Sequence, residues 1–196
     1  MHRPVLLVPG FLDGPGSFFR LGRHLRSEGF DARALRLSPR LATCSLHDFA
    51  RQVAAEVEAT RQASGVETVD LVGFSMGGLV SRLYVQRHGG AERVRRLITL
   101  ASPHAGSHVA RIMPQQATRE MRPGSDLLTD LDRDIEMLEE VDVASLWTPY
   151  DLTVLPGSSG ALSVGTSEAI PVKLHRLMLL DRRVFERVSE LLRDEG

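Results

Sequence analysis

The sequence predicts an α/β fold in which a mostly parallel central sheet of about six strands is flanked by helices. Short apolar runs alternate along the chain with longer segments whose apolar residues recur at helical spacing. Glycine or proline follows most of these segments, as is typical of loops between strands and helices. A length of 196 residues, with 42% hydrophobic and 25% charged residues, fits one soluble domain. We therefore expect residues 1–196 to form a single domain.

The predicted elements can be placed in chain order. Strands are expected at residues 5–8, 31–37, 68–72, 94–100, 144–150 and 172–174. Helices are expected at residues 17–28, 45–63 and 76–88, and in a last segment whose apolar stripe is Val184, Phe185, Val188, Leu191 and Leu192. Ser45 and Asp48 resemble a capping box that opens the second helix. Asp181 is the candidate N-cap of the last helix.

Residues 105–144 differ from the rest of the chain. They contain prolines, a Pro123-Gly124 pair and a cluster of acidic residues, without a strong strand pattern. We expect a lid-like insertion with one or two short helices above one end of the sheet.

Composition limits the partners and the location of the protein. The formal net charge of −1 gives no bulk attraction to nucleic acid or to an anionic membrane. The apolar run at residues 5–8 is too short for a signal peptide, and no run approaches the about 18 apolar residues of a membrane span. We therefore expect a cytoplasmic protein with no nucleic-acid partner and no stable membrane insertion. Cys44, the single cysteine, is interpreted as a structural thiol. No cysteine and histidine cluster has metal-ligand spacing, so no metal or other cofactor is expected.

Ser75 carries the clearest chemical signal. It lies in GFSMG (residues 73–77), directly after a predicted strand and at the start of a predicted helix. A sharp turn at that place forces the serine into strained backbone dihedrals and lifts its Oγ clear of the sheet. Gly73 and Gly77 are small enough to let the helix and the neighbouring strands approach the turn. Ser75 is therefore the predicted nucleophile, and a glycine-rich turn with an incidental serine is the structural alternative.

A serine nucleophile needs a histidine base. For a serine on a strand-to-helix turn, an acid and then the histidine follow in the chain. Four histidines are excluded by order or by distance along a helix: His2, His24, His47 and His88. Of the remaining three, His175 lies between a predicted strand and the last helix, at the carboxyl edge of the sheet, where sites of parallel sheets form. His175 is the predicted base; His104 is the reserve, and His108 is the third.

The base needs an acid that orients it. Asp151 follows the strand that begins near residue 144, so it is the predicted acid. Asp142 precedes that strand, and the acidic residues 126–134 lie in the insertion, where charge more often solvates a surface. Asp181 follows the histidine and is sufficiently explained as a helix cap.

An oxyanion needs two backbone N–H donors. The residue after the nucleophile, Met76, is one candidate because it opens a helix whose dipole also helps. The second donor is expected from the loop after the first strand, where glycines permit an inward turn. Phe11 is the first choice there, and Leu12 is the alternative; an ordinary strand-end loop is the structural alternative.

Taken together, these segments resemble the small bacterial triacylglycerol lipases and esterases of the α/β-hydrolase superfamily. The resemblance is carried in chain order by residues 8–11, 73–78, 99–106 and 149–151 and by His175. It implies the same triad, Ser75, Asp151 and His175, and the same oxyanion donors, Phe11 and Met76. It also implies a minimal α/β-hydrolase fold whose sheet starts at the third strand of larger members. Many relatives have His-Gly where this chain has Pro9-Gly10.

The expected activity is cleavage of a carboxylic ester, either of a small molecule or of a lipid, through an acyl-enzyme. A thioesterase, an amidase or an acyltransferase would use the same triad, and a non-catalytic binding protein would keep the same fold. Action at a lipid surface would need exposed apolar residues near the site. The sequence offers four candidates for that surface: Phe11, Leu12, Phe18 and Phe19.

Overall fold

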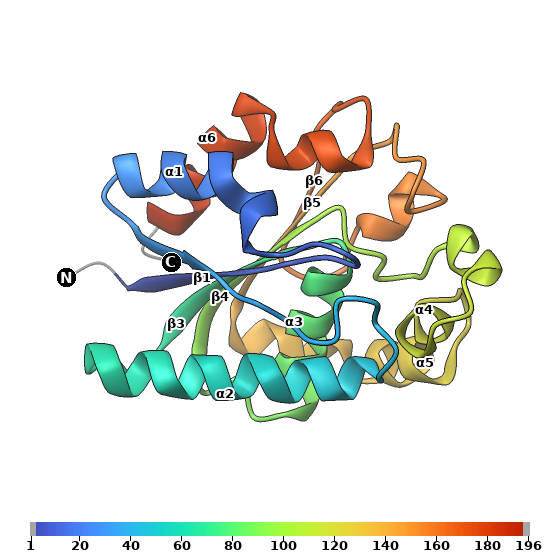
Figure 1. Ribbon diagram of the computed structural model, residues 1–196, viewed down its shortest axis with the longest axis horizontal. Coiled ribbons are helices and arrows are strands. Elements are labelled where there is room, and N and C mark those ends of the chain that lie inside the picture. Colours follow the sequence, from blue (N-terminus) through green and yellow to red (C-terminus); the bar gives the residue numbers. More distant parts are fainter. Residues whose placement is uncertain (1–2, 194–196) are drawn as a thin grey trace.

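The computed structural model describes residues 3–193, which form three layers around one parallel sheet (Figure 1). Within these residues the sheet has the strand order β2-β1-β3-β4-β5-β6, and every neighbouring pair is parallel. The strands are β1 (Pro4–Val8), β2 (Asp31–Ala34), β3 (Val69–Phe74), β4 (Val94–Leu100), β5 (Asp142–Trp147) and β6 (Thr166–Ala169). This arrangement confirms the predicted fold class.

Helices cover both faces of the sheet. α1 and α6 lie on one face, and α2 and α3 lie on the other (Figure 1). The α-helices are α1 (Phe19–Ser27), α2 (Leu46–Ser64), α3 (Met76–Arg87), α4 (Gln116–Glu120), α5 (Asp126–Arg133) and α6 (Arg182–Arg193). Short 3-10 helices are η1 (Pro15–Phe18), η2 (His108–Ile112), η3 (Ile135–Glu140), η4 (Gly157–Gly160) and η5 (His175–Leu179).

The core divides into two clusters, one on each face of the sheet. Val5 and Leu7 of β1 belong to the cluster under α1 and α6, and Leu6 and Val8 belong to the cluster under α2 and α3. β1 is buried along its whole length because both of its faces are covered. Each such side chain stabilises the fold by roughly 1.5–3 kcal/mol when fully buried. The core therefore fixes the carboxyl ends of the strands, from which the loops of the site extend.

Most element positions match the predictions, and the differences have local causes. The capping box of Ser45 and Asp48 is present at α2, and Asp181 Oδ1 accepts from the N–H of Arg183 at the start of α6. β2 ends at residue 34, three residues early, although Leu35 N–H still donates to Leu7. β5 runs over 142–147 rather than 144–150. It starts earlier because Asp142 pairs with Arg96 of β4, and it ends earlier because Pro149 has no N–H to donate to a neighbouring strand.

The prediction of the last strand at residues 172–174 was wrong. β6 lies at Thr166–Ala169, where it pairs with β5 at the edge of the sheet. Its side chains are mostly polar and exposed, so the segment lacks the apolar pattern by which a strand is recognised. Val172 is buried in the core beneath α6, which explains its apolar character without a strand.

The insertion is fixed to α3. Arg82 of α3, fully buried, donates to Asp132 Oδ1 at 2.8 Å, and Arg87 pairs with Asp130 and Asp134. The Gln86 amide donates to the carbonyls of Leu131 and Asp134 at 2.8 and 2.7 Å. The acidic residues 126–134 were expected to solvate a surface, and three of them also pair with arginines of α3 while staying about half exposed. Two short α-helices and two 3-10 helices form the segment, and its role as a lid stays a prediction.

Candidate active site

Ser75 lies on a strained turn between β3 and α3. Its φ of 52° and ψ of −124° are outside the regions that residues other than glycine favour, as the sequence predicted. The Ser75 N–H donates to the carbonyl of Leu100 at 2.8 Å, which fixes the turn to the end of β4. Ser75 is 9% exposed. The strain is therefore held by the neighbouring strand, and the side chain stands at the carboxyl edge of the sheet.

Glycines allow neighbouring segments to pack closely against the turn of Ser75. A Cβ on Gly73 would lie 2.4 Å from the Cα of Gly78, and one on Gly78 would lie 1.9 Å from the Oγ of Ser102. A Cβ on Gly10 would lie 3.1 Å from the Cβ of Ser75. A Cβ at Gly73 would clash with the backbone of the first turn of α3, and one at Gly78 would clash with the side chain of Ser102. The predicted need for small residues at the turn is confirmed, and Ser102 is a packing partner that the sequence did not indicate.

Asp151 and His175 form a buried pair in the adjacent loops. Nδ1 of His175 lies 2.7 Å from Oδ2 of Asp151. The other carboxylate oxygen, Oδ1, accepts from the N–H groups of Thr153 and Val154, each at 2.8 Å. The two residues are 3% and 7% exposed, respectively. Since Asp151 occupies Nδ1 and is itself held by the backbone, the ring orientation is fixed and Nε2 is left for another partner.

Two further contacts involve the loops of this pair, and one of them reaches the residue before Ser75. The ring of His175 lies on the ring of Phe74, the residue before Ser75, with centroids 4.7 Å apart. The Thr148 hydroxyl after β5 donates to the carbonyl of Val172 at 2.5 Å, which joins the loop of the acid to the loop of the histidine. The structure thus brings the three predicted side chains to one edge of the sheet.

The other candidate histidines and acids lie elsewhere. His104 is buried with Nε2 at 3.0 Å from the Thr99 hydroxyl, and its burial holds the pKa of the imidazole well below the usual value. His47 and His88 contact each other at 3.0 Å. Asp142 begins β5 and pairs with Arg96 at the amino edge of the sheet. His2 lies outside the described residues. Among the described histidines, only His175 contacts a carboxylate in the manner predicted.

The loop after β1 faces the start of α3. Asp13 N–H donates to the carbonyl of Gly10, so residues 10–13 form a tight turn in which Leu12 has a φ of 61°. A Cβ on Gly77 would meet the carbonyl oxygens of Val8 and Pro9, so this loop rests on the first turn of α3. In the part of the chain that the structure describes, the N–H groups of Phe11 and Met76 have no acceptor. The N–H of Leu12 is equally free, so both candidates in this loop stay open.

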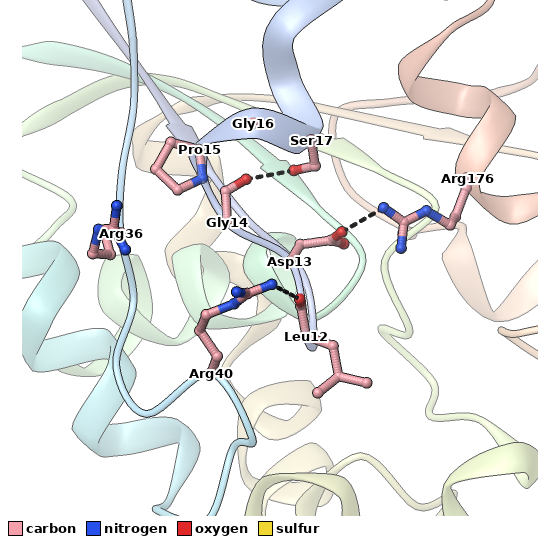
Figure 2. A pocket seen from close by; sticks show the side chains of 9 residues that line it. All are labelled: Leu12, Asp13, Gly14, Pro15, Gly16, Ser17, Arg36, Arg40 and Arg176. Carbon is pink, nitrogen blue, oxygen red and sulfur yellow. Dashed lines mark hydrogen bonds and ion pairs between the residues drawn. The ribbon is translucent and has the colours of Figure 1, made fainter.

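Two arginines hold this loop from outside. Arg176, the residue after His175, pairs with the buried carboxylate of Asp13 at 2.8 Å, and Arg40 donates to the carbonyl of Leu12 at 2.8 Å (Figure 2). Asp13 therefore links the loop after β1 to the loop of the histidine. Sequence reasoning missed this link, since a lone aspartate and a distant arginine carry no recognisable pattern.

Exposed apolar side chains lie next to the candidate residues in the chain. We call this set the apolar rim: Leu12, Tyr150, Leu152, Leu174 and Leu177. Of the four residues that the sequence offered for such a surface, Leu12 and Phe19 are exposed, Phe11 is half-buried and Phe18 is buried. The missed members flank Asp151 and His175, and their exposure depends on how the loops after β5 and β6 fold, which the sequence pattern does not show.

Other features of the described chain have no part in the candidate site. Cys44 is a half-buried free thiol whose pKa is raised by burial and by the Asp48 carboxylate. Within residues 3–193 there is no group of three or more histidine, cysteine or acidic side chains that could hold a metal ion. Over the same residues, none of the helices is both long and apolar enough to span a membrane.

Comparisons with known proteins agree with this architecture. The model of the family described as the alpha/beta hydrolase fold matches residues 3–155. The mature lipase of Bacillus licheniformis is similar in structure, with a TM-score of 0.85 and 19% identity, over 97% of this chain and 92% of that chain. A monoacylglycerol lipase of Paleococcus ferrophilus gives a TM-score of 0.71 and 14% identity, over 96% and 93%.

Lipase B of Aspergillus fumigatus gives a TM-score of 0.78 and 16% identity, over 100% of this chain and 53% of that chain. No curated protein sequence matches the chain. At these identities the structural likeness shows the fold. Because the family model spans most of the chain, including Ser75 and Asp151, this protein belongs to the alpha/beta hydrolase fold family.

Proposed function

We propose that the protein hydrolyses carboxylic esters through a Ser75–His175–Asp151 triad and an acyl-enzyme intermediate. The observation that carries the proposal is the 2.7 Å contact between Asp151 and Nδ1 of His175, beside a serine on a strained strand-to-helix turn. The hydrolase fold is common to many reactions, so the argument rests on these side chains rather than on the fold.

The chemistry follows from the positions of the groups. His175 Nε2 takes the proton of the Ser75 hydroxyl as Oγ bonds to the ester carbonyl carbon, and Asp151 stabilises the imidazolium. The N–H groups of Phe11 and Met76 donate to the tetrahedral oxyanion. His175 then protonates the leaving alcohol as its C–O bond breaks, and the acyl group stays on Ser75. Water repeats the sequence, adding to the acyl carbon and releasing a carboxylic acid and free Ser75.

An ester with an apolar acyl group fits the surroundings of this triad. The apolar rim offers exposed leucines and a tyrosine on the loops that carry Leu12, Asp151 and His175. Such a surface favours apolar substrate groups over water. The proposed substrate is therefore a small-molecule or lipid ester.

Active-site labelling and turnover test the proposal. We expect a fluorophosphonate probe to label the wild-type protein and not Ser75→Ala, and Ser75→Ala to lose on the order of 10⁶-fold in kcat on a p-nitrophenyl ester. Ser163→Ala is the matched control, since Ser163 is exposed and has no partner among the described side chains. Unlabelled wild type, or full activity of Ser75→Ala, contradicts the triad. Faster turnover of a matched thioester or amide contradicts the choice of substrate.

A further inference from the structure

A pocket opens beside the loop after β1. Its volume is about 440 Å³, and it is bounded by loop residues 12–17 and by Arg36, Arg40 and Arg176. We call it the arginine pocket. Arg36 and Arg40 approach from the segment after β2, and Arg176 approaches from the other side of the loop, at the start of η5 (Figure 2). Three distant parts of the sequence thus meet at one cavity.

The arginine pocket has an excess of positive charge. Three arginines and one carboxylate line it, and that carboxylate, Asp13, has a side chain that is only 5% exposed and is bonded to Arg176. Arg40 donates one N–H to the carbonyl of Leu12, and this neutral acceptor leaves the positive charge of Arg40 uncompensated. Arg36 has no hydrogen-bond or ion-pair partner within residues 3–193. Like charges gathered at one cavity repel one another, so an anion there would lower the electrostatic energy.

The position of the arginine pocket relates it to the reaction. Leu12 follows Phe11, the proposed oxyanion donor, and Arg176 follows His175, the proposed base. Gly10 lies between Asp13 and Ser75. A Cβ built on Gly10 would be 3.1 Å from Asp13 Oδ2 and 3.1 Å from the Cβ of Ser75, so both side chains pack against this glycine. In the proposed reaction His175 protonates the leaving alcohol, and the loop that carries His175 also carries Arg176.

We propose that the arginine pocket binds an anionic group, a phosphate or a carboxylate, carried by the leaving alcohol of the ester. The inference rests on the proposed ester hydrolysis and specifies its substrate class. Guanidinium groups suit this task because their planar set of N–H donors matches the oxygens of phosphate and carboxylate. The substrate then has an apolar acyl group for the apolar rim and a charged alcohol for the arginine pocket.

Matched esters test the inference. We compare kcat/KM for butyryl glycerol, for butyryl glycerol phosphate and for a butyryl ester of a hydroxycarboxylate, and the two charged esters tell phosphate from carboxylate. We expect the wild type to prefer at least one charged ester by about tenfold, and Arg36→Gln to reduce that preference by about threefold to tenfold. Raised ionic strength should weaken the preference as well, because salt screens exposed charges.

Arg93→Gln is the matched control. Arg93 directly precedes β4 at the opposite edge of the sheet, where it pairs with an exposed glutamate. We expect this variant to keep the wild-type preference. Equal kcat/KM for charged and neutral esters, or an unchanged preference in Arg36→Gln, would overturn the inference. A monoester of a dicarboxylic acid carries the negative charge on its acyl group. A preference for this ester alone, and not for the esters of charged alcohols, would also overturn the inference.

A binding measurement separates this inference from the proposed function. Ser75→Ala is titrated by NMR with glycerol phosphate, a hydroxycarboxylate and glycerol, which need no catalysis. We expect at least one anion to bind more tightly than glycerol, and Arg36→Gln in the same background to weaken that binding. If no ester is hydrolysed while this difference persists, the proposed ester hydrolysis fails and the anion site stands. If esters are hydrolysed without any difference in binding, the anion site fails alone.

Discussion

The carbonyl oxygen of Val8 lies 2.1 Å from the place that a Cβ on Gly77 would occupy. The end of β1 and the first turn of α3 are therefore in contact through backbone atoms. This contact sets the separation between the loop of Phe11 and the turn of Ser75. Any side chain at Gly77 has to push these two elements apart.

Gly77→Ala is expected to lower both stability and activity. Overpacking of this kind costs about 1–3 kcal/mol, and here the backbone has to move at the proposed oxyanion site. Gly22→Ala in α1 is the matched control, because a Cβ there first meets the flexible end of Arg26. Urea unfolding and ester turnover measure the two effects. Wild-type activity in Gly77→Ala would show that the separation of the two loops is unimportant.

Asp151→Asn should reduce turnover without unfolding the protein. An asparagine oxygen can still accept from Thr153 and Val154, but the amide no longer favours the tautomer of His175 with a proton on Nδ1. In serine triads this change lowers kcat by about 10⁴-fold. Steady-state kinetics and circular dichroism measure the two expectations. A variant with unimpaired turnover would exclude Asp151 as the orienting acid.

Asp132→Asn should destabilise the protein although Asp132 is itself half exposed. Its partner Arg82 is fully buried, and the lost carboxylate leaves a charged guanidinium without its ion pair. We expect a loss of about 1–3 kcal/mol in the free energy of unfolding. Glu139→Gln, an exposed change in the same insertion, should alter stability little. Equal stability of the two variants would mean that Arg82 does not depend on Asp132.

Stability should fall in mild acid because of His104. Burial lowers its pKa in the folded state, so below the usual pKa of 6.5 the unfolded chain binds a proton that the folded protein excludes. The free energy of unfolding then falls with pH by up to about 1.4 kcal/mol per pH unit for this group. His88, whose pKa is lowered as well, acts in the same direction.

The difference between wild type and His104→Gln isolates the contribution of His104. We expect the variant to be less stable above pH 7, where the Thr99 contact is intact in the wild type, and to lose less stability on acidification. Urea unfolding over a range of pH measures both. Parallel pH profiles would show that His104 does not titrate differently in the two states.

Structural features that depend only on neighbouring residues in the chain could be predicted from the sequence. The strand before Ser75, the helix after it and the capping box of α2 each depend on neighbouring residues, and all three are present. The positions of Asp151 and His175 followed from chain order, and the structure places them in contact.

Features that depend on distant residues escaped prediction. β6 is a strand because β5 is beside it, not because of its own polar residues. The acidic residues of the insertion look like solvent-facing charge until α3 supplies Arg82 and Arg87. The pair of Asp13 and Arg176 joins loops at opposite ends of the chain. In each case the decisive partner is remote in sequence and common in type.

The anchoring of the insertion also determines which parts of this protein can be exchanged by recombination. The side chains from Met76 to Gln86 in α3 are all buried, partly beneath the insertion. A chimera that replaces residues 105–141 alone removes the Asp132 carboxylate that pairs with Arg82 and the Leu131 carbonyl that accepts from Gln86. A recombination experiment should therefore exchange α3 together with α5, rather than the insertion alone. A library designed on that boundary should yield more folded members than one cut at the ends of the insertion.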